Sequence, residues 1–450
     1  ENIGQIEIIK GAASALYGSS AMNGVINVKT AFAKSKPETY ISVYSSYFDT
    51  PRDQYDEDGE LLDKKWWNYE SITFAGLEDT VEVPLDEPHP YNVGVSFSHR
   101  RKMGKNENLD FVLGGQYFKE QRWRYGEPDH RGRLNGNIRY RATDKMTFGT
   151  GFSLRYAQSG TFFLWRGLGE DKYLPNSLTG QPTNSKTLNF EINPYFNIFD
   201  DKGNSHKVLT RYLKVDVENT NDQSNASDLL YLEYQYQKQF NDIGLNFSAG
   251  AVSSYLHSIA PLFGGKRLHG ANFALYAQAD KKFFEKLNVS LGLRVESNVL
   301  TDTKSETKPV ARFGLNYQAA KATFIRASIG QGYRFPSIAE KFITTQLGSD
   351  LAIRPNPDLT SETGMSIEVG VKQGWQTSNS AFKGFFDVSF FYMRFNDMME
   401  FNVYSDTAYL VAFQSSNVGN TFISGIETNI FAQGKLLSLI HISEPTRRHL

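Results

Sequence analysis

The strongest constraint on the fold is a two-residue alternation of apolar and polar side chains. Between residues 287 and 299 it is almost unbroken, with apolar residues at Leu287, Val289, Leu291, Leu293, Val295 and Val299. Because successive side chains of a β-strand point to opposite faces, this spacing predicts a strand with one apolar and one wet face. The alternation recurs at residues 148–156, 209–217, 230–236, 273–279, 311–317, 323–329, 367–371 and 422–430.

Composition indicates what the apolar faces contact. The chain of 450 residues has a mean hydropathy of −0.44 and 14% aromatic residues, and no apolar run approaches the ~18 residues of a transmembrane helix. A transmembrane β-barrel fits this composition, since only alternate residues of each strand face lipid. We count about sixteen such strands, many of the roughly ten residues that a tilted membrane strand needs. The expected fold class is all-β, an antiparallel up-and-down barrel.

The connections between these strands alternate in length along the chain. Short turns are predicted at residues 102–108, 143–145, 200–204, 241–242, 284–286 and 319–321, and long loops at residues 50–90, 119–131, 158–186, 258–270 and 331–363. Outer-membrane barrels have short turns at one end and long extracellular loops at the other. A soluble sandwich or propeller is the alternative, but such folds have no reason to sort their loops in this way.

The opening block carries a more specific signal. Residues 6–11 read I-E-I-I-K-G and residues 15–28 read A-L-Y-G-S-S-A-M-N-G-V-I-N-V. This block resembles the closing segment of the plug domain of TonB-dependent outer-membrane receptors, in which a strand, a turn and an L-Y-G-S stretch lead into a last strand before the barrel. The resemblance implies that the chain begins within a plug domain.

Further blocks resemble the barrel of the same family, in the family's order. They are S-I-G-Q-G-Y-R-F-P-S at residues 328–337, N-P-D-L at 356–359 followed by Glu362, I-E-V-G at 367–370, and G-I-E at 425–427. The N-terminal part of the plug, with its TonB box, and the last barrel strands of the family pattern are missing from this sequence. The resemblance therefore implies about sixteen of the roughly 22 strands of a plugged transporter.

The domain boundaries expected from these blocks are a plug end at residues 1–33 and a partial barrel at residues 34–436. The last residues, 437–450, resemble the translation of a sequencing adapter and are expected to carry no biological structure. No secretory signal precedes Glu1, which indicates that the chain starts inside a gene.

The family resemblance implies energised uptake of a scarce solute across the outer membrane of a Gram-negative bacterium. An iron-siderophore is the first expectation for the cargo, and cobalamin, haem or a glycan are the alternatives. The implied partners are TonB, outer-membrane lipid and a small ligand such as a metal chelate, with no cofactor. A passive porin and a surface adhesin remain as functions of another class.

The sequence contains few of the motifs that indicate an enzyme. The eight histidines show no H-x-x-x-H pair, there is no cysteine, and no G-x-S-x-G motif occurs, so neither a metal site nor a catalytic residue is predicted. A net charge of −1 gives no argument for nucleic-acid binding. The expectation is a protein that is not an enzyme.

A few residues are candidates for ligand or plug contacts. Trp123, Arg124, Trp165 and Arg166 lie in predicted extracellular loops, where aromatic and guanidinium groups bind ligands by stacking and bidentate contacts; the alternative places both Trp in the interfacial aromatic girdle. Arg334 is a further ligand candidate, although a role in fixing its loop is the simpler reading. Lys10 and the lumen-facing Glu296 are candidates for an ion pair between plug and barrel, by analogy with the family.

Overall fold

The computed structural model describes most of the chain. The described residues are 3–10, 15–20, 24–49, 55, 58–59, 71–73, 80–82, 90–162, 164–165, 174–175, 182–220, 223–301, 303–346, 351–378, 382–405 and 411–434. Within them the dominant element is one 16-stranded sheet, in the order β24-β21-β20-β17-β16-β15-β14-β13-β12-β11-β10-β9-β8-β7-β6-β3. Every neighbouring pair in this sheet is antiparallel. The up-and-down fold and the strand number expected from the sequence are confirmed.

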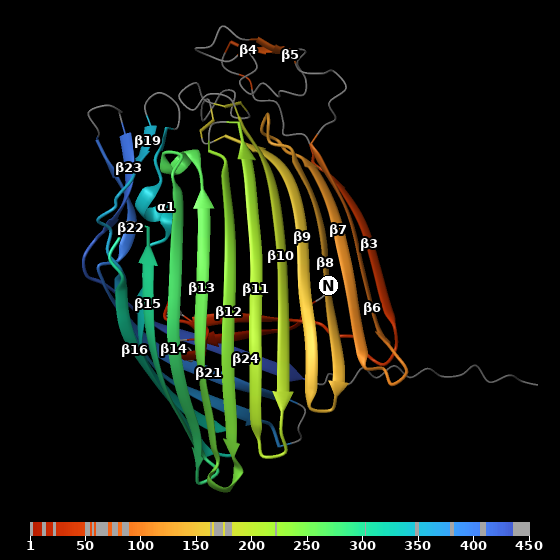
Figure 1. The fold of residues 1–450 in the computed structure, drawn as a ribbon, viewed down its shortest axis with the longest axis vertical. Coiled ribbons are helices and arrows are strands. Elements are labelled where there is room, and N and C mark those ends of the chain that lie inside the picture. The colour runs from red at the N-terminus through yellow and green to blue at the C-terminus, as the bar shows by residue number, and fades with distance from the viewer. Residues whose placement is uncertain are drawn as a thin grey trace, which may run out of the picture.

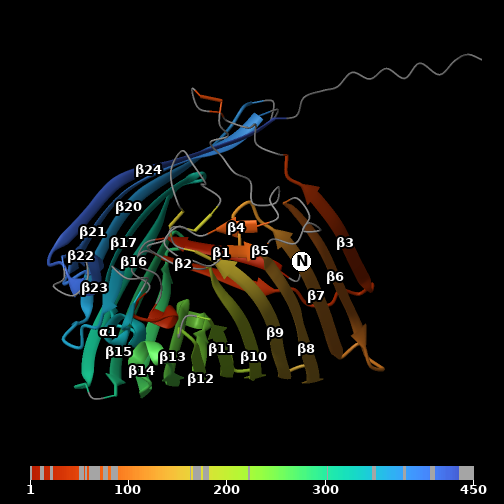
Figure 2. The ribbon, with the colours of Figure 1, turned by 90° about the horizontal axis from the view of Figure 1, so that it is seen from above.

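The strands of this sheet are long and mostly consecutive in the chain. Their bounds are β3 (Glu38–Tyr47), β6 (Tyr91–Met103), β7 (Leu109–Gln121), β8 (Asp129–Thr143), β9 (Met146–Thr161), β10 (Thr183–Phe199), β11 (Asn204–Asn219), β12 (Asn225–Phe240), β13 (Leu245–Ile259), β14 (Arg267–Phe283), β15 (Leu287–Leu300), β16 (Glu306–Ala320), β17 (Thr323–Arg334), β20 (Glu362–Gln376), β21 (Phe382–Asn396) and β24 (Thr421–Gly434). Seen from above, they form an open arc (Figure 2). As far as the described residues go, β3 and β24 are its two edges.

The predicted faces of the strands are confirmed at β15. Leu291, Leu293 and Val295 are about half exposed on the outer face, whereas Arg294 between them is only 5% exposed. Exposed apolar side chains on the outside and polar ones on the inside are the arrangement of a sheet that meets lipid outside and water or protein inside.

The connections are sorted between the two ends of the sheet. Tight turns join β6 to β7, β8 to β9, β10 to β11, β12 to β13, β14 to β15 and β16 to β17 at one end, called here the short-turn end, and longer connections cluster at the other, the long-loop end (Figure 1). The predicted long loop at 119–131 is wrong in extent, because strand pairing continues to Gln121 and resumes at Asp129. Polar residues extend these strands past the apolar band, so hydrophobic alternation ends before hydrogen bonding does.

A small hairpin lies inside the arc. β1 (Ile3–Lys10) pairs with β2 (Gly24–Thr30) in antiparallel register, and a 3-10 turn, η1 (Ala15–Tyr17), belongs to the segment between them. We call β1 and β2 the inner hairpin, and residues 15–20 the inner loop. Figure 2 shows the inner hairpin enclosed by the curved sheet.

The long-loop end carries its own secondary structure. A four-stranded sheet comprises β18 (Thr345–Gln346), β19 (Leu351–Arg354), β23 (Val411–Asn417) and β22 (Met399–Tyr404), in that order, and the helix α1 (Ile338–Phe342) precedes it. The short strands β4 (Ser71–Thr73) and β5 (Thr80–Glu82) pair with each other above the arc (Figure 1). No helix of the described chain is long and apolar enough to cross a membrane.

Candidate functional site: the contact between inner loop and sheet

The inner loop rests on the inner wall of the sheet. Leu16 packs against a buried cluster of Val252, Ala274 and Tyr276, which come from β13 and β14, and η1 also contacts β15 and β16. Ser19 is only 4% exposed. A side chain of the L-Y-G-S motif thus fills an apolar spot on an otherwise polar wall, which fixes where the inner loop sits.

Two barrel residues bind the backbone of the inner loop. The Arg312 guanidinium on β16 donates to the Gly18 carbonyl at 2.8 Å and to the Ser19 carbonyl at 3.4 Å. The backbone N–H of Tyr333 on β17 donates to the same Ser19 carbonyl at 3.1 Å. Arg312 and Tyr333 are both buried, and hydrogen bonds that a buried charged donor makes are stronger than neutral ones. We call this arrangement of Arg312, Tyr333, Gly18 and Ser19 the clasp.

The clasp depends on the local shape of the inner loop. Gly18 has φ = +96°, a backbone conformation that residues with a Cβ rarely adopt. This conformation turns the Gly18 and Ser19 carbonyls toward β16 and β17. The glycine of the L-Y-G-S motif is therefore explained by the backbone geometry that the clasp needs.

A charged network supports the clasp from the barrel side. Arg294 donates to Glu296 at 2.6 Å, and the Asn272 amide donates to Glu296 at 2.8 Å. Glu233 accepts hydrogen bonds from the hydroxyls of Tyr231 and Tyr276, each at 2.7 Å. With Arg312, the network holds two arginines and two glutamates, so its formal charges balance, as burial in the lumen requires.

The predicted plug–barrel candidates are only partly described. Glu296 does lie at the contact, with the Ser19 hydroxyl in hydrogen-bonding reach, but its ionic partner is Arg294 of its own strand. Lys10 ends β1, and its side chain lies outside the described part, so its pairing with Glu296 stays a prediction. Sequence reasoning missed Arg312, although strand parity in residues 311–317 already places it on the same face as other polar lumen residues.

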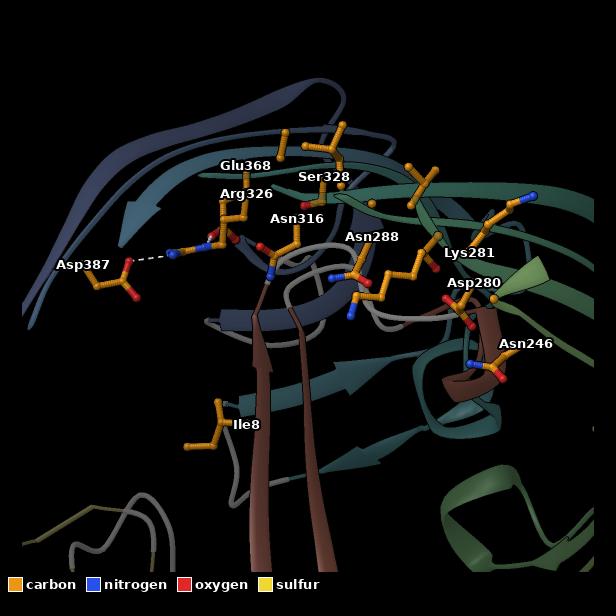
Figure 3. Close-up of a pocket in the computed structure, with 17 residues that line it drawn as sticks. Ile8, Asn246, Asp280, Lys281, Asn288, Asn316, Arg326, Ser328, Glu368 and Asp387 are labelled. Atoms are coloured by element: carbon orange, nitrogen blue, oxygen red, sulfur yellow. Dashed lines mark hydrogen bonds and ion pairs between the residues drawn. The ribbon is translucent and has the colours of Figure 1, made fainter. Parts of the chain in front are cut away.

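A cavity of about 720 Å³ lies beside the inner hairpin, toward the short-turn end. Ile8 of β1 faces it from one side, and polar side chains such as Asn246, Asn288 and Asn316 line the wall (Figure 3). Arg326 on this wall donates to Glu368 at 3.0 Å and to Asp387 at 2.6 Å. The lumen next to the inner hairpin therefore has a polar, charged wall.

The predicted ligand-binding residues near the first long loops each contact different residues. The Trp123 ring packs edge-on against Phe48, with 5.9 Å between ring centroids. Arg124 forms an ion pair with Glu127 at 2.7 Å and lies over the Phe162 ring. Trp165 is 43% exposed and bridges to Pro175 through its backbone. Arg166 lies outside the described residues.

Arg334 connects three segments at the long-loop end. Its guanidinium donates to Glu340 of α1 at 2.6 Å and to Glu362 at the start of β20 at 3.3 Å. Ser337 and Glu340 form a capping box at the beginning of α1, in which each side chain bonds the other residue's backbone N–H. Burial raises the pKa of Glu340, but the hydrogen bonds from Arg334 and Ser337 outweigh burial, and the pKa lies below its ordinary value. The reading of Arg334 as a residue that fixes its loop agrees with these contacts.

Within the described residues, no group of three or more histidine or acidic side chains is placed to hold a metal ion. No curated protein sequence matches the chain significantly.

The solved structures that share this fold include several receptors. The siderophore receptor PirA from Pseudomonas aeruginosa matches with a TM-score of 0.71 at 14% identity, over 96% of this chain and 69% of PirA. The ferric enterobactin receptor PfeA in complex with BCV-L6 matches with a TM-score of 0.69 at 15% identity, over 95% of this chain and 65% of PfeA. The hemophore receptor HasR from Serratia marcescens matches with a TM-score of 0.67 at 10% identity, over 96% and 67%. The chain thus spans about two thirds of the length of these receptors.

A family model decides the classification. The model of the TonB dependent receptor-like beta-barrel matches residues 86–441, which include every strand of the main sheet except β3. The sheet topology and the structural matches agree with it. The chain belongs to the family of TonB-dependent receptor-like β-barrels.

Proposed function

We propose that the protein takes up a scarce solute across the outer membrane of a Gram-negative bacterium, with energy delivered through TonB. The observation that carries the proposal is the clasp, which binds the inner loop to the inner wall of the barrel. An inner segment that is bound to the barrel wall acts as a gate in the lumen. Its bonds to the wall must be broken to move it, and we propose that a partner delivers the energy for this. Transport of this kind involves no covalent chemistry, in agreement with a family of receptors rather than enzymes.

The domain arrangement follows from this proposal. The inner hairpin and inner loop, within residues 1–33, form the end of a plug, and residues 34–436 form part of a larger barrel. The edges of the sheet support this, because β3 and β24 each pair on one side only within the described residues. Each unpaired backbone group costs several kcal/mol in hydrocarbon, so further strands must cover both edges in the membrane.

The cargo that we propose is an iron-siderophore. PirA and PfeA are siderophore receptors by their names, whereas HasR is a hemophore receptor solved with its hemophore and heme, so haem is the second candidate. Of the two candidate tryptophans, Trp165 is the more exposed, while Arg124 and Arg334 are bound by carboxylates. Trp165 is therefore the side chain that we expect to stack on a ligand.

The test is uptake by the complete receptor that contains this chain. Cells that express it should accumulate a ⁵⁵Fe-siderophore from a panel of catecholates and hydroxamates, and deletion of TonB should abolish the uptake. Equal receptor levels in the outer membrane are checked on gels. Uptake of the same ligand without TonB would identify a passive pore, and uptake of haem alone would change the cargo.

The ligand site is tested separately by equilibrium binding to the purified receptor. Trp165→Ala should weaken binding about tenfold through the lost stacking, whereas Trp165→Phe should retain most of the affinity. Equal affinity in all three proteins would remove Trp165 from the ligand site without affecting the transport proposal.

A further inference from the structure

Two arginines on adjacent strands of the inner wall lie directly opposite each other. Arg133 on β8 and Arg155 on β9 are paired in the antiparallel register, and we call them the arginine pair. Directly opposed residues on one face of a sheet have Cβ atoms about 4.5–5.5 Å apart, and like charges at this spacing destabilise the sheet. Such a pair is stabilised by a partner of opposite charge.

Strand parity places the arginine pair on the lumen side of the sheet. The even-numbered residues Leu134 and Leu154 are 40% and 41% exposed on the outer face, so the odd-numbered arginines beside them point inward. Asn137, which has the parity of Arg133, donates to the Thr30 hydroxyl of the inner hairpin at 3.1 Å. Because β8 starts at the long-loop end, the arginine pair lies between the long-loop opening and the inner hairpin.

The charges of the arginine pair are not balanced within the described residues. Arg133 donates to the neutral Ser153 hydroxyl at 3.2 Å. Arg155 forms no hydrogen bond or ion pair with any residue of the described part of the chain. Both side chains are exposed, so a solute in the lumen reaches them.

Carboxylates of the neighbouring wall are bound by other arginines. Arg122 binds Glu120 at 2.8 Å and Asp129 at 3.2 Å. Arg211 on β11 binds Glu191 of β10 at 3.2 Å. These acids are engaged in ion pairs of their own, which leaves the two positive charges of the arginine pair to an anion that enters the lumen.

The arginine pair offers the chemistry of an anion-binding site. Guanidinium groups present planar forks that bind two adjacent oxygens, and they also stack on aromatic rings. Gln116 on β7 and Asn189 on β10 are the other in-register neighbours of the two arginines, and their amide groups can donate hydrogen bonds as well. A catecholate combines adjacent anionic oxygens with an aromatic ring, so it fits both modes of guanidinium binding.

We propose, on the basis of the uptake function proposed above, that the arginine pair binds the cargo and that this cargo is a ferric tris-catecholate. Three doubly charged catecholates around Fe³⁺ give a triply negative complex, whereas three singly charged hydroxamates give a neutral one. Two unpaired cations in the lumen attract the first complex and gain nothing from the second. β9 continues from Arg155 into the loop that carries Trp165, so the two proposed ligand contacts follow each other along one strand.

The test is equilibrium binding of three probes to the complete receptor in detergent: a ferric tris-catecholate, a neutral ferric tris-hydroxamate and haem. The tris-catecholate should bind at least about tenfold more tightly than the other two. Arg133→Gln and Arg155→Gln should each weaken its binding by about tenfold or more. Lys207→Gln is the matched control, because it removes a cation of the same inner wall near the short-turn end. It should change the affinity by less than about twofold.

The stability of the ligand-free receptor separates a binding role from a structural one. Arg155→Gln removes one of two like charges, so its folded band on heat-modifiable gels should persist to the same or a higher temperature than that of the wild type. Removal of a structural arginine would lower that temperature.

Four outcomes would overturn the assignment of the cargo. They are equal affinity for the tris-hydroxamate, tighter binding of haem, equal weakening by Lys207→Gln, and a loss of ligand-free stability in Arg155→Gln. The dependence of uptake on TonB is measured separately, with whichever chelate the cells accumulate. Each of these four outcomes therefore leaves the uptake proposal standing.

Discussion

Arg312 and Arg326 stand on neighbouring strands of the same inner wall, but different parts of the chain hold them. Arg326 is bound by Glu368 and Asp387, two carboxylates of the barrel itself. Arg312 donates to backbone carbonyls of the inner loop and, at 3.5 Å, to the Gln331 carbonyl on β17. The first site belongs to the barrel alone, whereas the hydrogen bonds from Arg312 to Gly18 and Ser19 exist only while the inner loop is docked. The comparison separates residues that stabilise the barrel from residues that hold the gate.

The comparison holds only if both arginines face the lumen. The assignment of strand faces can be tested on the neighbouring strand β15. Leu291→Arg places a charge on the lipid face and should cost about 2–4 kcal/mol near the bilayer midplane. Ser290→Arg points into the cavity beside the inner hairpin and should cost much less. The measurement is reversible unfolding of the complete receptor in bilayers. Equal losses of stability from the two variants would contradict the assignment of the lipid and lumen faces.

Removal of the barrel-held arginine should destabilise the barrel. Arg326→Met leaves Glu368 and Asp387 without their shared cation, and the expected loss is about 1–3 kcal/mol, limited by the partial exposure of the arginine. An Arg326→Met barrel as stable as the wild type at neutral pH would contradict this reading of the site.

Removal of the loop-held arginine should open the gate with a smaller effect on the barrel. Arg312→Met deletes the donor to the Gly18 and Ser19 carbonyls, and we expect about 1 kcal/mol or less in barrel stability. Cells without TonB should nevertheless become permeable to a bulky antibiotic that the outer membrane normally excludes.

Two variants sharpen this prediction. Gly18→Ala should produce a similar leak, because the backbone at φ = +96° disfavours a residue with a Cβ. Arg326→Met serves as the control and should not leak, despite its lower stability. The same leak from Arg326→Met and Arg312→Met would erase the distinction between the two sites.

The smallest expected effect is the pH dependence of α1. Since the pKa of Glu340 is lowered in the folded protein, its contribution is fully present above the ordinary glutamate value of about 4.3 and is lost as the pH falls through the lowered value. The protection factors of residues 338–342 against hydrogen exchange should therefore fall in acid, by an amount equivalent to less than about 1 kcal/mol. In Glu340→Ala, which removes the side chain of the capping box, the protection factors should be low already at neutral pH. An α1 insensitive to both changes would show that the capping box contributes nothing.

The sequence predicted the sheet better than the site, for a physical reason. Alternation reports which face of a strand meets lipid, so the faces at Leu291 and Arg294 followed directly from residue types. Contacts between residues on different strands depend also on the register of strand pairing. That register is set by the positions of the turns, which the alternation does not determine. Arg312 was indistinguishable from other lumen polar residues until β16 and β17 were placed beside Ser19. The capping box of Ser337 and Glu340 was visible as an S-x-x-E spacing, but it stood inside a segment expected to be a loop.

The order of strands in the main sheet has a consequence for how the barrel assembles. Twelve of its strands, from β6 to β17, are neighbours in chain order, so most of their pairings close only a short loop and lose little chain entropy. The exception is the β9–β10 pair, which closes across residues 162–182. The pairs β3–β6, β17–β20 and β21–β24 instead close across the inserted β4–β5, β18–β19 and β22–β23 segments. We therefore expect the strands of the central hairpins to pair early during insertion. The pairings across these three segments should form last.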